Sequence, residues 1–163
     1  MYWHQEAENF YLGDASLVMP RIRSMNQHGT GKRNHGREYP PLVLILEDFD
    51  SIRAYLKNHF KMQGYEVSSA ATIRDALEMA EEQYPQVIII DYDLSGEDAY
   101  EAIRRLRAIL PLSYIVLMGG PDTATIEENA RRSGASRVLA KAYELGELDE
   151  AVIGAFNRQT QLA

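Results

Sequence analysis

The stretch VIIIDYDLS, residues 87–95, decides the fold. Its first four residues form a short and wholly apolar run, which is typical of a central strand in a parallel sheet whose two faces are both covered. The run ends in Asp91, so a carboxylate lies at the carboxyl end of the predicted strand. A second run of the same kind, LVLIL at 42–46, ends in Glu47 and Asp48.

Helical and strand patterns alternate around these two runs. Asp50 or Ser51 is predicted to cap the first helix, and Thr72 with Asp75 resembles a capping box for the second. Gly134 is predicted to end the fourth helix. The predicted helices span about 50–62, 72–84, 97–108, 122–133 and 145–157, and the further strands span 65–68, 114–118 and 138–140. Five strands alternating with five helices indicate a doubly wound α/β fold with a parallel sheet.

Composition narrows the class of protein. The chain has 163 residues, a net charge of −7 and no cysteine, so disulfides and thiolate sites are excluded. Residues 1–40 show no sustained period and are predicted to form a flexible leader. The folded part is predicted over 41–158, and the tail at 159–163 is too short for an output domain. No run is long and apolar enough to span a bilayer, so a cytoplasmic protein is expected.

Charged side chains gather at the predicted carboxyl ends of the strands. Glu47 and Asp48 follow the first strand, Asp91 the third and Lys141 the fifth. In an open α/β sheet, ligands bind at this edge, where the winding reverses. Carboxylates this close repel one another unless a cation lies between them. The sequence therefore predicts a Mg²⁺ site, since this ion takes a few carboxylates and leaves room for phosphate oxygens.

Three motifs together resemble the receiver domain of bacterial two-component response regulators: LEDFDSIR at 46–53, IIDYDLSGED at 89–98 and SGASRVLAK at 133–141. The resemblance covers about residues 41–158 and implies a flavodoxin-like sheet of order 2-1-3-4-5. It implies that Asp91 is the phosphoacceptor and that Lys141 pairs with a phosphoryl oxygen. It also implies that Glu47, Asp48, Asp91 and the backbone carbonyl of Asp93 hold Mg²⁺.

The resemblance also implies partners. A sensor histidine kinase or phosphotransfer protein would donate the phosphoryl group, and the chain would act by docking on a downstream protein rather than as an enzyme. The helix at 122–133, the strand at 138–140 and the helix at 145–157 would form the partner surface or a homodimer surface. Residues 41–163 carry twelve Lys and Arg against twenty Asp and Glu, which argues against a nucleic-acid surface on this domain.

The chain departs from the family pattern at the positions that report phosphorylation. Gly119 stands where the family has a Ser or Thr, and Val138 stands where it has a switch Tyr or Phe. Ala142 replaces the proline after the lysine. These departures keep open a degenerate receiver that works as an interaction module without phosphate.

A haloacid-dehalogenase-like phosphatase is the remote alternative, because Asp91 and Asp93 also match the first motif of that class. Against it, that motif normally ends the first core strand. The similarity suggests a narrower hypothesis, in which Asp93 orients water and shortens the lifetime of the phosphate. The histidines are expected to be solvated rather than to act as ligands, and His59 lies on a predicted helix whose sequence shows no partner pattern.

Overall fold

The computed structural model describes residues 41–160, with side chains as far as residue 158. The predicted leader at 1–40 lies outside the described residues. So does most of the predicted tail at 159–163, although the backbone of the last helix continues to Thr160. The strands are β1 (Leu42–Leu46), β2 (Glu66–Ala70), β3 (Val87–Asp91), β4 (Tyr114–Met118) and β5 (Arg137–Leu139). The helices are α2 (Asp50–Met62), α3 (Ile73–Gln83), α4 (Ala99–Ile109), α5 (Ala124–Ser133) and α6 (Leu145–Thr160).

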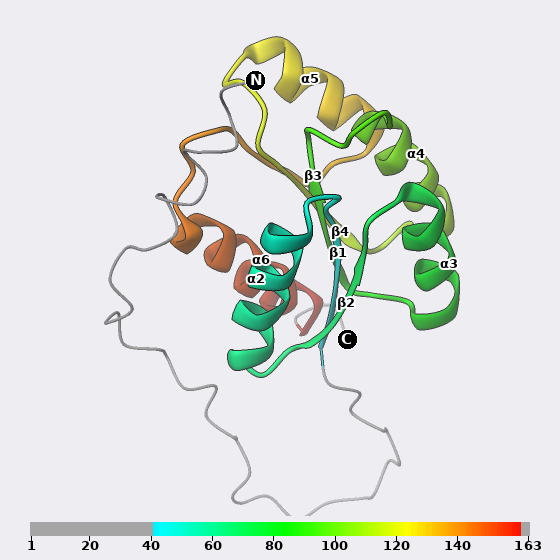
Figure 1. Ribbon diagram of the computed structural model, residues 1–163, viewed down its shortest axis with the longest axis vertical. Helices are drawn as coiled ribbons and strands as arrows, with labels where there is room; N and C mark the ends of the chain where they lie inside the picture. The colour runs from blue at the N-terminus through cyan, green and yellow to red at the C-terminus, as the bar shows by residue number, and fades with distance from the viewer. Residues whose placement is uncertain (1–40, 161–163) are drawn as a thin grey trace, which may run out of the picture. The chain divides into compact units, whose positions relative to one another are not determined.

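The five strands form one parallel sheet in the order β2-β1-β3-β4-β5. This confirms the predicted doubly wound α/β fold and its strand order. The winding runs outward from β1 to β2 in one direction and through β3, β4 and β5 in the other (Figure 1). The reversal lies between β1 and β3, so the residues that come directly after these two strands are neighbours at the carboxyl edge of the sheet.

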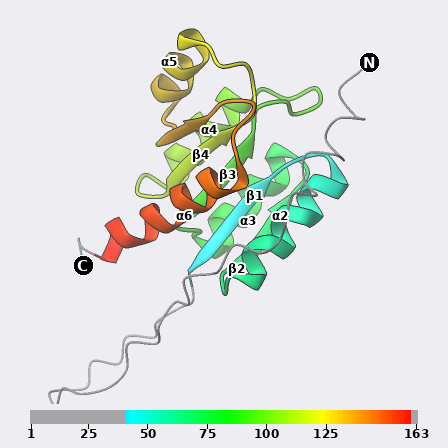
Figure 2. The same cartoon turned by 90° about the vertical axis from the view of Figure 1, so that its left-hand side faces the viewer.

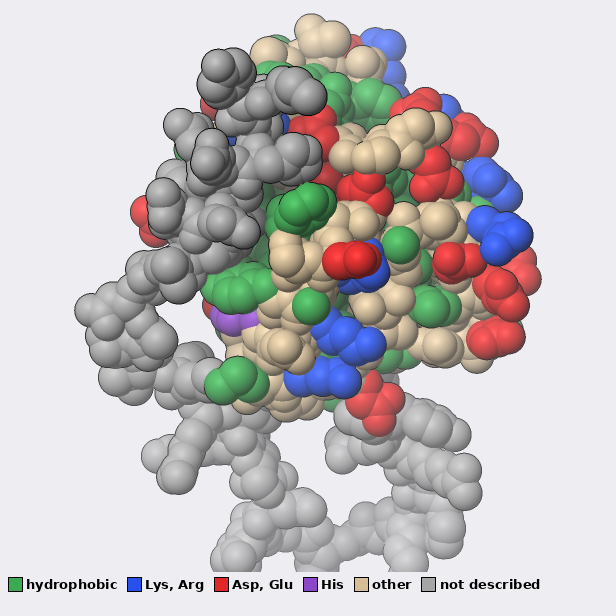
Figure 3. Space-filling model, viewed as in Figure 1, with side chains coloured by type: hydrophobic (Ala, Val, Ile, Leu, Met, Phe, Trp, Pro, Cys, Tyr) green, Lys and Arg blue, Asp and Glu red, His purple; other side chains and the backbone are tan. Residues whose placement is uncertain are grey.

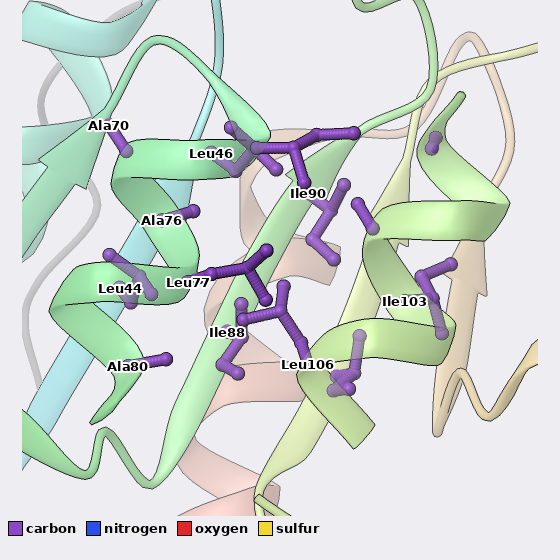
Figure 4. Packing of buried hydrophobic residues seen from close by; sticks show 14 of the residues in the cluster. Leu44, Leu46, Ala70, Ala76, Leu77, Ala80, Ile88, Ile90, Ile103 and Leu106 are labelled. Carbon is purple, nitrogen blue, oxygen red and sulfur yellow. The ribbon is translucent and has the colours of Figure 1, made fainter. Parts of the chain in front are cut away.

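Helices cover both faces of the sheet, which explains why β1, and β3 as far as Ile90, contain only apolar residues. Helices α3, α4 and α5 lie over one face and α2 and α6 over the other (Figures 1 and 2). Alternate residues of each strand face opposite layers. Leu44 and Ile88 pack beneath α3 and α4, as Figure 4 shows, while Ile45 and Ile89 belong to the second core with α2 and α6. All four side chains are fully buried.

The helix starts are set by local polar contacts, and one prediction about them is wrong. Thr72 caps α3 as predicted, since its hydroxyl accepts a hydrogen bond from the backbone N–H of Asp75. Neither Asp50 nor Ser51 caps α2; Phe49 is the N-cap residue of this helix, and no side chain supplies a capping hydrogen bond there. The physical reason is that the carboxylate of Asp50 pairs with the guanidinium of Arg53 inside the first turn.

The fourth predicted helix also begins later than its sequence pattern indicated. Helix α5 begins at Ala124, with Thr123 as its N-cap, and Gly134 ends it as predicted. No helix among residues 41–160 is long and apolar enough to cross a membrane. Acidic side chains are spread widely over the face drawn in Figure 3, whereas Lys and Arg form smaller groups on it.

Candidate functional site

The first part of the site is the acidic pair directly after β1. Glu47 is 2% exposed, and its Oε1 accepts a hydrogen bond from the backbone N–H of Phe49 at 2.9 Å. Asp48 is half-buried, and its Oδ2 accepts one from the backbone N–H of Ser95 at 2.9 Å. The two carboxylates therefore have different environments. The bond to Ser95 fixes the loop after β3 against the end of β1.

Asp91 completes the acidic cluster from the end of β3. Glu47, Asp48 and Asp91 each offer a carboxylate oxygen, and these oxygens lie within 4.8 Å of one another. The fold brings together the three acidic side chains that the sequence predicted for this site. Residues 47 and 91 are far apart in the chain but adjacent here, because β1 and β3 are neighbouring parallel strands.

The electrostatics of the cluster reflect burial and mutual repulsion. Burial, reinforced by the charge of Asp91, raises the pKa of Glu47 to about 8. Burial and the charges of Asp93 and Asp48 raise the pKa of Asp91 to about 6. Burial alone would raise the pKa of Asp48, but hydrogen bonds from Ser95 outweigh it and leave that pKa below its usual value. Buried acids that raise the pKa of one another are in the situation that a bound cation relieves.

Lys141 lies at the same edge of the sheet and is bonded to Asp93. Its Nζ donates to Oδ2 of Asp93 at 2.8 Å, and both side chains are substantially exposed. The side chain of Asp93 therefore belongs to an ion pair instead of only facing water. Its backbone carbonyl as a metal ligand stays a prediction, as does the pairing of Lys141 with a phosphoryl oxygen.

The two atypical positions lie beside the cluster. Gly119 comes directly after β4 with a φ of +81°, and a Cβ placed there would lie 3.0 Å from Oδ1 of Asp91. Gly120, with a φ of +78°, lies under the ring of Tyr92. A Ser or Thr at 119 would be strained in this backbone, since side chains rarely adopt such a φ. Val138 on β5 is half-buried and packs against the core under α3 and α4.

Sequence reasoning missed one residue that shapes the site. The Nη1 of Arg53 donates to the backbone carbonyls of Glu47 at 2.9 Å and Asp48 at 3.2 Å. This side chain holds the acidic pair in place from the first turn of α2. A basic residue in the first turn of a predicted helix, shortly after two adjacent acidic residues, is a sequence signal that could have identified Arg53.

Known proteins share this fold and the sequence that carries the cluster. The family model of the response regulator receiver domain matches residues 43–153. The chain belongs to this family. The match covers all three carboxylates of the cluster and all five strands except the first residue of β1, and it favours the receiver interpretation over the haloacid-dehalogenase-like phosphatase. The curated relatives with similar sequences include regulatory proteins from several bacteria.

Two of the relatives differ in how much of their length the matching region represents. The transcriptional regulatory protein AfsQ1 of Streptomyces coelicolor is 32% identical over 118 residues, which are 72% of this chain and 52% of that protein. Sporulation initiation phosphotransferase F of Bacillus subtilis is 26% identical over 110 residues, 68% of this chain and 89% of that protein. The chain thus spans about half the length of the first relative and most of the second.

Solved structures share the fold. A CheY-like receiver domain protein from Methanospirillum hungatei has a TM-score of 0.71 at 20% identity, covering 77% of this chain and 100% of that one. The chemotaxis protein CheY4 of Vibrio cholerae has a TM-score of 0.63 at 24% identity, covering 74% and 98%. Both agree with the strand order and helix placement described above.

Proposed function

We propose that Asp91 accepts a phosphoryl group from a phosphohistidine on a sensor histidine kinase or phosphotransfer protein. The observation that carries this proposal is the meeting of Glu47, Asp48 and Asp91 within 4.8 Å at the winding reversal of a receiver fold. The domain then signals by docking on a downstream protein and does not act as an enzyme on a small substrate. A cytoplasmic location is part of the same proposal.

The acidic cluster fits a magnesium ion. Its ligand atoms are carboxylate oxygens, which Mg²⁺ prefers, and the raised pKa values of Glu47 and Asp91 mark charge that a cation would neutralise. Glu47, Asp48 and Asp91, with the backbone carbonyl of Asp93, would hold it. When bound, the ion supplies positive charge to the oxygens of the transferring phosphoryl group.

The residues of the chain then have distinct tasks. A carboxylate oxygen of Asp91 forms a bond to phosphorus while the bond from phosphorus to the histidine nitrogen breaks, and the imidazole leaves with its electron pair. A pKa of about 6 leaves Asp91 mostly ionised at neutral pH, as a nucleophile must be. Lys141, already bonded to Asp93 at 2.8 Å, would pair with a phosphoryl oxygen. Such transfer depends mainly on positioning and charge neutralisation.

The family and the relatives indicate the kind of partner. A phosphotransferase among the relatives, from Bacillus subtilis, supports a role in a phosphorelay, and the transcriptional regulatory protein AfsQ1 supports a regulatory role. We infer protein partners for this domain. Its acidic balance gives no support for direct contact with nucleic acid. A homodimer through α5, β5 and α6 remains part of the proposal.

A degenerate receiver is the second candidate, favoured by Gly119 and Val138. The two candidates differ in whether Asp91 is phosphorylated at all.

The experiment that distinguishes the two candidates is incubation with Mg²⁺ and a small phosphodonor, followed by intact-protein mass spectrometry. We expect the gain of one phosphate in the wild-type chain, its loss in Asp91→Asn, and its retention in the matched variant Asp75→Asn on the exposed start of α3. An unmodified wild-type chain would instead favour the degenerate receiver.

A further inference from the structure

We propose that Tyr92 couples the state of Asp91 to α4 and to the loop between β4 and α5. This inference rests on the proposed function, because it concerns the response of the domain when Asp91 carries a phosphoryl group. In the family pattern, a Ser or Thr hydroxyl at position 119 and an aromatic ring at position 138 report phosphorylation. This chain has Gly119 and Val138 there, so both groups are missing. Tyr92 is the ring that lies between the phosphoacceptor and both of these elements.

The first contact of Tyr92 is with the loop after β4. A Cβ built on Gly120 would lie 2.8 Å from Cγ and 2.9 Å from Cδ1 of Tyr92, so the ring lies directly on the backbone of that glycine. The backbone N–H of Tyr92 also donates to the carbonyl of Met118 at 2.9 Å. Any shift of Gly120 toward or away from the sheet therefore acts on the ring without an intervening side chain.

The second contact is with α4. The rings of Tyr92 and Tyr100 meet edge to face, with centroids 6.0 Å apart and planes at 76°. Tyr100 lies in the first turn of α4, and both rings are half-buried against the core beneath this helix. Burial raises the pKa of Tyr100 and the neighbouring Tyr92 adds to the rise, as expected where two phenol groups adjoin. One ring thus spans the distance from the loop to the helix.

The loop itself is placed to respond to Asp91. The Cβ position of Gly119 is 3.0 Å from Oδ1 of Asp91, so backbone and carboxylate adjoin with no side chain between them. A phosphoryl group would bring close to two negative charges and three oxygens to this point. The backbone N–H of Gly119 donates to the carbonyl of Leu139 at 2.9 Å, and the carbonyl of Gly120 accepts from the N–H of Lys141 at 2.8 Å. Two backbone hydrogen bonds therefore connect the loop after β4 to the end of β5.

Position 138 offers no comparable link. Val138 borders a hollow of about 80 Å³ whose lining includes Thr123, Ile126 and Ala140, and no aromatic residue contributes to this lining. A movement of the loop after β4 meets no ring in this hollow. In contrast, Gly120 of this loop lies directly against the ring of Tyr92, and Tyr92 contacts Tyr100 at the start of α4.

The test uses the full chain with Mg²⁺ and beryllofluoride as the phosphoryl mimic. Fluorine NMR reports whether the mimic binds, and hydrogen exchange reports how the amides of α4 and of residues 119–126 respond. Tyr92→Leu keeps apolar bulk and removes the ring, Tyr92→Phe keeps the ring, and Val138→Ala is the matched control at the other position. We expect all three variants to bind the mimic, and only Tyr92→Leu to lose most of the exchange response in α4.

The outcomes separate this inference from the proposed function. Binding of the mimic with a wild-type response of α4 in Tyr92→Leu would overturn the coupling role and leave the phosphoacceptor role intact. A wild-type chain that binds neither mimic nor phosphate would overturn both. If Tyr92→Leu fails to fold, Tyr100→Leu interrupts the same contact from α4, and the same loss of response is required of it.

Discussion

At the scale of single residues, the two carboxylates that follow β1 have opposite tendencies to hold a proton. Glu47 is buried and its pKa is raised to about 8, while bonds from Ser95 lower the pKa of the neighbouring Asp48. Adjacent positions in the chain therefore differ because one carboxylate is almost fully buried, whereas the other accepts a hydrogen bond from the loop after β3. This difference has consequences for stability that can be measured without a kinase.

The metal-free chain is expected to lose stability as the pH rises from about 4.5 to about 8. In this window Glu47 holds its proton when folded, with a pKa of about 8, but not when unfolded, with a pKa of 4.5. The folded state then binds more protons, so rising pH favours unfolding. Asp91, shifted from 3.8 to about 6, adds the same trend over the lower part of the window.

Magnesium is expected to reverse this trend, because it binds the deprotonated carboxylates and stabilises only the folded state. Thermal unfolding across the window, with chelator or with Mg²⁺, provides the measurement. Glu47→Gln is the control and is expected to lose most of the pH dependence of the metal-free chain. A metal-free melting temperature that rises with pH between about 4.5 and about 8 would contradict the assignment.

Asp93 carries a second prediction at this scale. If its carboxylate orients water toward the phosphoryl group, Asp93→Asn is expected to slow the loss of phosphate from the phosphorylated chain. The ion pair with Lys141 at 2.8 Å holds this carboxylate on the same side of the site as the lysine. The decay of phosphoprotein after removal of the donor gives the rate. An unchanged rate would remove the role of Asp93 in hydrolysis.

At the scale of elements, the loop between β5 and α6 has a backbone conformation that matches the replacement of the family's proline by Ala142. Ala142 has a φ of 71°, in the left-handed region. The family's proline requires a φ near −65°, so it does not fit this loop. The side chain of Ala142 is exposed, and its backbone strain is not offset by packing.

Ala142→Gly is expected to raise the free energy of unfolding by about 0.5–1 kcal/mol, since relief of the left-handed strain exceeds the added entropy of the unfolded chain. Ala142→Pro is expected to lower it by about 2 kcal/mol or more. Urea denaturation of the two variants beside the wild-type chain tests both. Equal stability of the glycine and proline variants would show that the loop adapts its backbone.

Elements were also the scale at which sequence reasoning succeeded best. The apolar runs ending in Asp91 and in Glu47 correctly predicted two central strands, because full burial on both faces leaves a pattern visible in five residues. The start of α4 was placed too early, at Glu97. The carboxylate of Glu97 instead accepts hydrogen bonds from the backbone N–H of Ile73 at 3.0 and 3.2 Å, at the start of α3. This hydrogen bond to another helix leaves no pattern in the sequence around Glu97, so the sequence could not predict it.

The parts of the candidate site that follow from the positions of the strand ends could be predicted from the sequence. The contacts between individual side chains were harder to predict. The meeting of Glu47, Asp48 and Asp91 results from sheet topology alone. The hydrogen bond between Lys141 and Asp93 does not, because the long and exposed lysine side chain can adopt many rotamers. The positive φ at Gly119 and Gly120 is equally invisible in sequence, since glycine adopts many conformations.

At the scale of the whole molecule, polar contacts to Asp149 join the first and last helices of the described range. His59 on α2 bonds to Asp149 on α6 at 2.7 Å, and Gln63 bonds to the same carboxylate at 3.1 Å. The expectation that the His59 side chain is solvated is therefore wrong. The partner is 90 residues away in the chain, so the helical pattern around His59 holds no trace of it.

The contact between His59 and Asp149 is expected to contribute about 0.5–1.5 kcal/mol of coupling energy to stability. Both side chains are mostly buried, at 20% and 24% exposure, so solvent screens the pair less than a surface pair. A double-mutant cycle with His59→Ala and Asp149→Ala, measured by urea denaturation at fixed pH, gives the coupling. Strictly additive effects would show that the two helices are held by their apolar contacts alone.

The turn at Gly119 and Gly120 also bears on how this protein can evolve. A serine arising at 119 by a single mutation would meet both an unfavourable φ of +81° and a carboxylate oxygen 3.0 Å from its Cβ. Any side chain at 120 would collide with Tyr92 as well. A hydroxyl at 119 would therefore require a change in the backbone of this turn and in the position of the Asp91 carboxylate. A single substitution at either glycine is thus expected to be costly, and the turn limits which receiver variants this chain can reach one residue at a time.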